Sequence, residues 1–179
     1  MNQEMIFAAA MGLVDPWYIT KVEFTKGESK LSMGKLDIYI DFKIGSKFKE
    51  VSSPVLYGAY DTVERRWRHA NFFQHECYVH AFVPRIKLPD GSVKQVQVPW
   101  AMKGSSFTLL FEAMSMLLVQ EGMSLSGAGR TVKEDSRVIG RIINIDSSNI
   151  SPTPYTTSYN TIYKVPPPLK NLNPLRAYP

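Results

Sequence analysis

The chain has 179 residues, of which 44% are hydrophobic and 12% aromatic, so it can bury the core of one domain or two small ones, and global disorder is excluded. Its single cysteine excludes an intramolecular disulfide and a cysteine-rich zinc site, and no apolar run reaches the roughly 18 residues that a membrane span requires. The formal net charge of +5 fits a polyanionic partner, and it fits an ordinary solvated basic face equally well. The lone cysteine and a start without a basic segment lead us to expect a cytoplasmic protein without a signal peptide.

The first part of the chain predicts a short helix and two strands. Residues 1–14 contain a short apolar segment that ends at Asp15-Pro16, because proline disfavours helix in the residue before it. Tyr18–Thr25 and Lys35–Phe42 alternate apolar and polar side chains, as half-buried strands do. The residues between these strands, 26–34, are rich in glycine, serine and charge, so we expect a hairpin.

A second hairpin is predicted further along. Residues 44–53 indicate a loop or a short irregular strand, and residues 59–68 a turn and another short strand. Glu76–Lys87 is rich in tyrosine, valine and isoleucine and predicts a strand. Residues 89–92, Pro-Asp-Gly-Ser, are turn residues, and Val93–Val98 alternates again, so these segments form the hairpin.

The hydrophobic period then changes from that of a strand to that of a helix. Residues 107–120 predict a helix that Ser105 or Ser106 caps and that Gly122 stops. Its predicted apolar face follows helical spacing: Leu109, Leu110, Ala113, Met114, Leu117 and Leu118.

Two more short helices are predicted. The second spans residues 125–131 after the capping Ser124, and Gly127 and Gly129 each weaken it by up to about 1 kcal/mol relative to alanine. The third runs to Ile145, and its candidate caps are Asp135 and Ser136. Three short helices with tight turns indicate a helix-turn-helix, and a plain three-helix cap on the sheet is the alternative.

The residues therefore predict the α+β class: a small antiparallel β module, which the resemblance described below implies to be ribbon-like, a three-helix helix-turn-helix-like unit and an irregular tail. The expected domains are residues 1–102, 103–145 and 146–179. Seven of the twelve prolines fall at or beyond Pro152, so we expect the last segment to be an extended, proline-rich arm.

Histidine and cysteine side chains near residue 75 first invite a metal or catalytic interpretation. On a strand, His75 and Cys77 share a face while His80 points to the other, so the three cannot converge on one ion without a bulge. Cys77 with His69 could form a nucleophile and base, but a lone cysteine among aromatic residues is typical of a core position. We expect no enzyme activity, no metal and no cofactor.

Three long segments carry a family resemblance: LDIYIDFKIGSKF at residues 36–48, AYDTVERRWRHANFFQHECYVHAFVPRIK at 59–87, and KQVQVPWAMKGSSFTLLFEA at 94–113. Over residues 1–145 the chain resembles the N-terminal part of transposases of the ISL-three insertion-sequence family. The resemblance implies a zinc-binding, ribbon-like module followed by a helix-turn-helix. In the family these recognise transposon-end DNA ahead of a large catalytic domain with acidic metal ligands.

The chain departs from the family at the zinc ligands. The two C-P-x-C-G knuckles of the family correspond to residues 53–58 and 88–92, which contain no cysteine. The four degenerate ligand positions, Ser53, Tyr57, Leu88 and Gly91, cannot supply thiolates, so we predict no structural zinc and expect Tyr57 and Leu88 to fill the volume by apolar packing. The chain also stops where the catalytic domain would begin, so no transposition chemistry is expected.

Two functions remain open. The first is a transposase-derived, non-catalytic protein that binds double-stranded DNA, with the third helix in the major groove and contacts from these candidates: Arg65, Arg66, Arg68, Lys103, Arg130, Lys133, Arg137 and Arg141. Against it, residues 103–145 carry five basic and four acidic residues and are barely positive. The second is a domesticated mobile-element fragment that binds a host nucleic-acid-binding protein complex as an inhibitor or adaptor, as anti-CRISPR proteins do. A decayed gene product is a third possibility that the regular strand pattern disfavours. The sequence does not give an oligomeric state.

Overall fold

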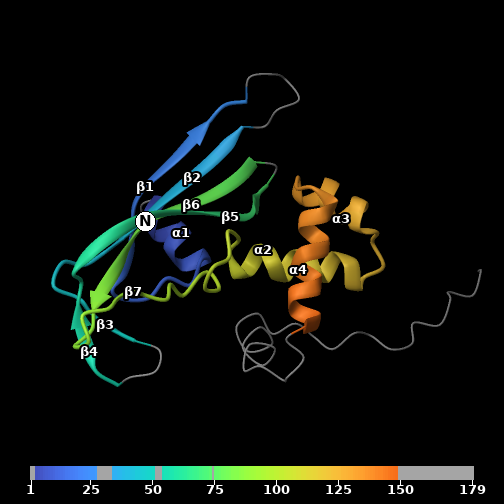
Figure 1. Cartoon of the computed structure of the whole chain (residues 1–179). Helices are drawn as coiled ribbons and strands as arrows, with labels where there is room; N and C mark the ends of the chain where they lie inside the picture. The colour runs from blue at the N-terminus through green and yellow to red at the C-terminus, as the bar shows by residue number, and fades with distance from the viewer. Residues whose placement is uncertain (1–2, 28–33, 51–53, 74, 149–179) are drawn as a thin grey trace, which may run out of the picture. The chain divides into compact units, whose positions relative to one another are not determined.

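The computed structural model describes residues 3–27, 34–50, 54–73 and 75–148 of the chain (Figure 1). The helices and strands are α1 (Gln3–Ala10), β1 (Trp17–Thr25), β2 (Lys35–Phe42), β3 (Lys47–Lys49), β4 (Leu56–Gly58), β5 (Asp61–Phe72), β6 (His75–Lys87), β7 (Val93–Gln95), α2 (Leu109–Gln120), α3 (Leu125–Val132) and α4 (Ser136–Ser148). The predicted α+β class is confirmed. The chain divides into two compact units, Met1–Ile142 and Ile143–Pro179, and the sheet, the core and the contacts described below lie in the first. The domain boundaries at residues 102 and 145 stay predictions, and residues 149–179 of the expected tail lie outside the described residues.

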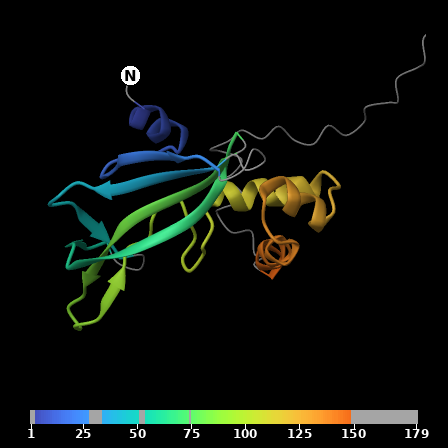
Figure 2. The ribbon, with the colours of Figure 1, turned by 90° about the horizontal axis from the view of Figure 1, so that it is seen from above.

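The main sheet has the strand order β1-β2-β6-β5, with β7 paired to the other end of β6. The predicted hairpins are confirmed, because β1 pairs antiparallel with β2 and β7 pairs antiparallel with β6. The expectation of a purely antiparallel module needs one correction, since β2 and β6 are parallel. Parallel neighbours require a long connection, and here it contains the small β3–β4 sheet and the whole of β5 (Figure 2).

Two strands differ in length from the prediction. β5 extends to Phe72, past the predicted end at residue 68, because it pairs antiparallel with β6 along nearly its whole length. β7 ends at Gln95, before the predicted end at Val98. Beyond β7 the backbone N–H of Val96 still donates to the carbonyl of Pro84, at 2.9 Å, and the Val96 and Val98 side chains stay buried. The alternation that predicted a longer strand therefore reflects burial that continues to Val98, past the last residue of β7.

The core of the sheet lies on one face. Leu36, Ile38 and Ile40 of β2 are buried, as their alternation predicted. Around them, Trp100 makes edge-to-face contacts with two other tryptophans, with ring centroids 5.0 Å from Trp17 and 5.7 Å from Trp67. Such aromatic pairs contribute about 0.5–1.5 kcal/mol each beyond the burial of their surface. The core therefore ties the first strand to the segment that leads into α2.

Helix α2 begins later than predicted. Its N-cap is Thr108, whose hydroxyl accepts from the backbone N–H of Phe111 at 3.3 Å, so neither Ser105 nor Ser106 is the cap. The buried residues of α2 are Phe111 and Ser115, whereas Met114 and Leu117, which we placed on the apolar face, are 40% and 44% exposed. This face of the helix was predicted wrongly because α2 carries apolar side chains around most of its circumference, so spacing alone does not select one side. The stop at Gly122 is confirmed by its φ of 90° and its hydrogen bond to the carbonyl of Val119.

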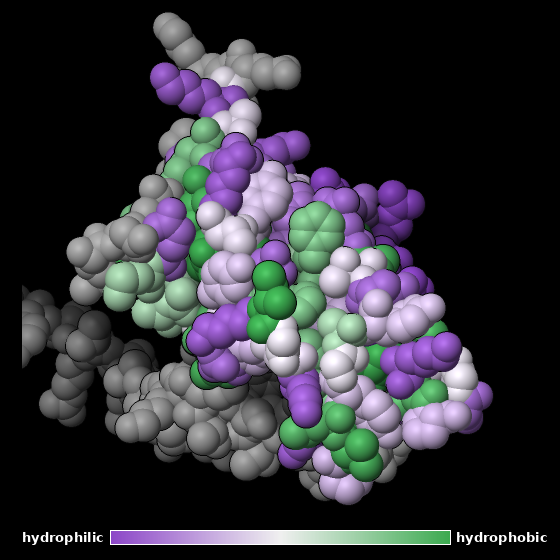
Figure 3. Space-filling model, turned by 90° about the vertical axis from the view of Figure 1, so that its left-hand side faces the viewer, coloured by the Kyte–Doolittle hydropathy of each residue, from purple (hydrophilic) through white to green (hydrophobic). Residues whose placement is uncertain are grey.

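The surface view of one face shows hydrophobic residues interspersed with hydrophilic ones (Figure 3). Isolated exposed apolar side chains of this kind are normal for a folded protein. No helix in the described ranges is long and apolar enough to cross a membrane.

Candidate nucleic-acid interface

Helices α3 and α4 are joined by a tight turn, as the sequence predicted. The Ser124 hydroxyl caps α3 by accepting from the backbone N–H of Gly127 at 3.1 Å. The helix ends at Lys133, which has left-handed φ and ψ of 59° and 48° and donates its N–H to the carbonyl of Gly129. The Asp135 carboxylate then accepts from the backbone N–H of Arg137 at 2.8 Å, which caps the start of α4. Helix α4 therefore begins only a few residues after α3 ends.

Gly129 has a packing role that the sequence did not reveal. It is buried, and a Cβ at this position would lie 2.6 Å from the backbone carbonyl oxygen of Glu134. This glycine, which has a low helix propensity, therefore allows the turn into α4 to approach α3 closely. Gly127 differs, because a Cβ there would meet mainly the flexible Met123 side chain, at 2.8 Å.

Helix α4 presents two arginines to solvent. Arg137 and Arg141 are exposed and four residues apart, whereas Ile139 and Ile142 are buried. The Arg137 side chain is 89% exposed and its Nε lies 3.1 Å from Asp135 Oδ1. Hydrogen bonds from Arg137, and the nearby charge of Arg141, hold the pKa of Asp135 below its ordinary value. One face of α4 is therefore basic and the other is apolar.

The other predicted cations of the helical part also lie at its surface. Arg130 is exposed in the last turn of α3, and Lys133 is exposed in the turn itself. Together with Arg137 and Arg141 they lie on α3, the turn and α4. A phosphate backbone that passes this region would meet side chains of the type that contacts phosphate in DNA complexes.

Arg68 lies elsewhere than predicted, because it is buried and only 4% exposed. Its guanidinium donates to the carbonyls of Cys77 and Val132, each at 3.0 Å, and its Nε lies 3.6 Å from the Glu134 carboxylate. It also lies over the Phe111 ring, with the guanidinium carbon 5.5 Å from the centroid. Arg68 thus connects the sheet to the turn between α3 and α4, and its hydrogen-bonding groups are directed into the protein. We therefore remove it from the proposed phosphate contacts.

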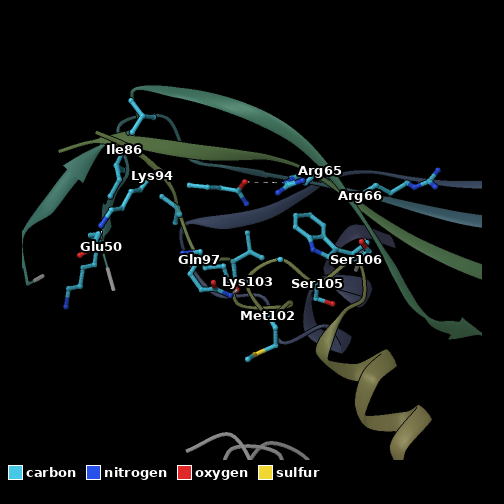
Figure 4. A pocket seen from close by; sticks show the side chains of 17 residues that line it. Glu50, Arg65, Arg66, Ile86, Lys94, Gln97, Met102, Lys103, Ser105 and Ser106 are labelled. Carbon is cyan, nitrogen blue, oxygen red and sulfur yellow. Dashed lines mark hydrogen bonds and ion pairs between the residues drawn. The ribbon is translucent and has the colours of Figure 1, made fainter. Parts of the chain in front are cut away.

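Arg65 and Arg66 are neighbours on β5 but extend in different directions. Arg65 and Lys103 line a groove of about 500 Å³ beside β7 and the segment before α2 (Figure 4). Arg66 also lines this groove, but its side chain extends away from it (Figure 4). Its guanidinium carbon lies 4.9 Å from the centroid of the Tyr78 ring. Strand alternation explains the difference. Lys49 and Lys94 also line the groove. Sequence analysis did not select them, because they come from strands far apart in the chain.

Of the four degenerate zinc-ligand positions, Ser53 lies outside the described residues. Tyr57 and Leu88 pack against the hydrophobic core, as expected. Gly91 occupies a turn with φ of 83°, and its N–H donates to the carbonyl of Leu88 at 2.9 Å. Over the described ranges there is no group of three or more histidine, cysteine or carboxylate side chains that could hold a metal ion. The absence of structural zinc stays a prediction.

The histidines and the cysteine are arranged as strand alternation predicts. Cys77 is fully buried, whereas His80 lies on the other face and contacts Asp37, with His80 Nε2 at 2.7 Å from the carboxylate. His69 is the cross-strand neighbour of Cys77, and its Nδ1 lies 2.8 Å from the Thr108 hydroxyl. Burial raises the pKa of Cys77 to about 12 and lowers that of His69 to about 4. The thiol therefore stays protonated near neutral pH and is a poor nucleophile.

Two short helices joined by a tight turn, with a basic face on the second, define the helix-turn-helix class of DNA-binding domain. Residues 96–144 match the family described as helix-turn-helix domain of transposase family ISL3. Over these residues the chain is thus similar to the helix-turn-helix domain of transposases, and the predicted helix-turn-helix is confirmed. No curated protein matches the chain, and no solved structure does. The family match begins at residue 96, so the zinc-ribbon resemblance of the preceding residues stays a prediction.

Proposed function

We propose that the protein binds double-stranded DNA with helix α4 in the major groove. The observation that carries the proposal is the two-sided character of α4, with Arg137 and Arg141 exposed and Ile139 and Ile142 buried. The major groove admits one α-helix, and arginine can bind guanine O6 and N7 with two hydrogen bonds. Arg137 and Arg141 are therefore the proposed base-contacting residues, and Arg130 and Lys133 are proposed to contact phosphate.

The small net charge of the helical part does not oppose this proposal. Of its four acidic residues, Glu134 faces Arg68 of the sheet, at 3.6 Å. Glu112 accepts a hydrogen bond from the Ser105 hydroxyl at 2.6 Å, in the segment before α2. Asp135 caps α4. Glu134 and Glu112 therefore have their contacts away from the exposed face of α4, whereas Asp135 also pairs with Arg137 at the start of that face.

We further propose that the protein acts without catalysis. Its cysteine is a buried thiol with a raised pKa, and the described residues contain no group of three or more histidine, cysteine or carboxylate side chains that could hold a metal ion. The protein-binding alternative, an anti-CRISPR-like inhibitor or adaptor, stays a prediction that no specific feature of the described residues favours.

The proposal is tested by fluorescence anisotropy with labelled duplex DNA at several salt concentrations. Arg137→Gln/Arg141→Gln should weaken binding by at least about tenfold, since each good base contact is worth about 1–3 kcal/mol. Lys26→Gln/Lys43→Gln removes the same charge from exposed lysines outside the helical part and should change affinity little. Wild-type protein that fails to bind duplex DNA at low salt, or equal losses in both variants, would contradict the proposal.

A further inference from the structure

A groove of about 500 Å³ lies between β7, β5 and the segment before α2, and none of its described lining residues belongs to α3 or α4. We call it the basic groove. Five cationic residues of the described chain line it, from β3, β5, β7 and the segment before α2: Lys49, Arg65, Arg66, Lys94 and Lys103, of which Arg66 extends its side chain away from the groove. Among the described lining residues there is one carboxylate, Glu50, and it forms an ion pair with Lys94 at 2.9 Å (Figure 4). The groove therefore keeps a positive excess after this pair is counted.

The positive charges of Arg65, Lys49 and Lys103 are not cancelled by a described neighbouring carboxylate. Arg65 donates from Nε to the neutral Gln95 side chain at 3.3 Å, which fixes the guanidinium without cancelling its charge. Lys49 and Lys103 are both exposed. A concave site lined by charges of one sign concentrates the field, so it attracts an anion more strongly than the same charges would on a flat surface.

Several of the other lining residues favour a phosphate chain over a nucleobase. Trp67, Val96 and Val98 are buried beneath the groove, whereas Val93 and Met102 are exposed and add apolar surface to it. Trp67 is the one aromatic residue among the described lining residues, and it is only 4% exposed, so the groove offers no stacking platform of the kind that single-stranded nucleic acids use. Gln95, Gln97, Ser105 and Ser106 add the hydroxyl and amide groups that bind phosphate oxygens.

We propose that the basic groove binds the phosphodiester backbone of one strand of duplex DNA, as a contact separate from α4. The proposal rests on duplex binding by the protein and assigns it a second contact site, which adds affinity without reading sequence. Each phosphate that a cation neutralises releases condensed counterions, so the groove must contribute to the salt dependence of binding.

The test compares two double variants with the same change in charge. Arg65→Gln/Lys103→Gln removes two cations from the groove, whereas Lys26→Gln/Lys43→Gln removes two exposed lysines that do not line it. Binding of duplex DNA is measured by anisotropy between about 50 and 200 mM salt. The groove variant should lower the slope of log K against log salt by about 1–2 units and weaken binding by about tenfold, while the control keeps the wild-type slope. Thermal unfolding of both variants confirms that they are folded.

The outcomes separate this proposal from the one for α4. If the groove variant and its control have equal slopes while the α4 variant loses affinity, the groove proposal is wrong and the proposed function stands. If the groove variant loses affinity and the α4 variant does not, the groove stands and the role of α4 is wrong. Tighter binding to a single strand of the same sequence, lost in the groove variant, would overturn the assignment to duplex DNA. Wild-type protein that binds no DNA would overturn both.

Discussion

The sheet and the helical part are stabilised in different ways. The sheet has a continuous hydrophobic core with three tryptophans, whereas the apolar side chains described as buried in the helical part are Phe111, Ala128, Val132, Ile139 and Ile142. The described residues include three buried polar side chains, Arg68, Thr108 and Ser115, and all of them lie in α2 or where the sheet meets the helices. The helical part therefore depends on specific polar contacts for its position, and the sheet depends on apolar area.

The largest effect is expected from Arg68→Ala. This change leaves the carbonyls of Val132 and Cys77 without their donor and the Glu134 carboxylate without its partner. Removing one member of a buried ion pair costs about 3–5 kcal/mol, so the free energy of unfolding should fall by about that amount. Urea unfolding measures it, and Arg66→Ala on the exposed neighbour should cost less than about 0.5 kcal/mol. Equal losses in the two variants would show that the junction, the contact of the sheet with the turn between α3 and α4, does not depend on Arg68.

The junction should also respond to pH through His69. Its folded pKa of about 4 lies below the ordinary 6.5, so the unfolded state binds the proton more tightly. The contribution of neutral His69 to the free energy of unfolding is therefore complete above pH 6.5. It is lost as the pH falls from 6.5 to 4, by up to about 3 kcal/mol. Comparing wild type with His69→Gln by urea unfolding across this range isolates the contribution. Parallel pH profiles for the two proteins would contradict it.

Two glycines of α3 test whether the turn depends on close packing. Gly129→Ala places a Cβ against the Glu134 carbonyl and should destabilise the protein by about 1–3 kcal/mol. Gly127→Ala meets a flexible side chain and gains helix propensity, so it should be neutral or stabilising by up to about 1 kcal/mol. Thermal unfolding of the pair measures the difference. A loss at Gly127 as large as at Gly129 would indicate that helix propensity and packing were assigned wrongly.

The smallest effect concerns the start of α2. Thr108→Ala removes a buried cap and the partner of His69, and should cost about 1–2 kcal/mol. Ser106→Ala, at a position that sequence alone offered as the cap, should cost little, because the Ser106 side chain is exposed. Chemical unfolding of both variants is sufficient. A larger loss at Ser106 would mean that the helix begins earlier.

Much of the local structure could be predicted from the sequence. Alternation located β1 and β2, and the content of tyrosine, valine and isoleucine located β6. Glycine, serine and aspartate located the turn into α3 and the start of α4. The parallel pairing of β2 with β6 could not be predicted, because hydrophobic alternation does not specify a strand's neighbour or its direction. The buried position of Arg68 was missed for a similar reason: it follows two exposed arginines, and its partners Val132 and Glu134 are more than sixty residues away in the chain.

The central claim is that α4 reads base pairs while the basic groove contacts the DNA backbone. Selection from a random duplex library tests it directly, with wild type, Arg141→Gln and Arg65→Gln/Lys103→Gln compared at one salt concentration. The account predicts that Arg141→Gln relaxes or changes base preference at one or two positions, and that the groove variant binds more weakly with the wild-type preference. An Arg141→Gln protein that selects the same bases as the wild type would contradict the account.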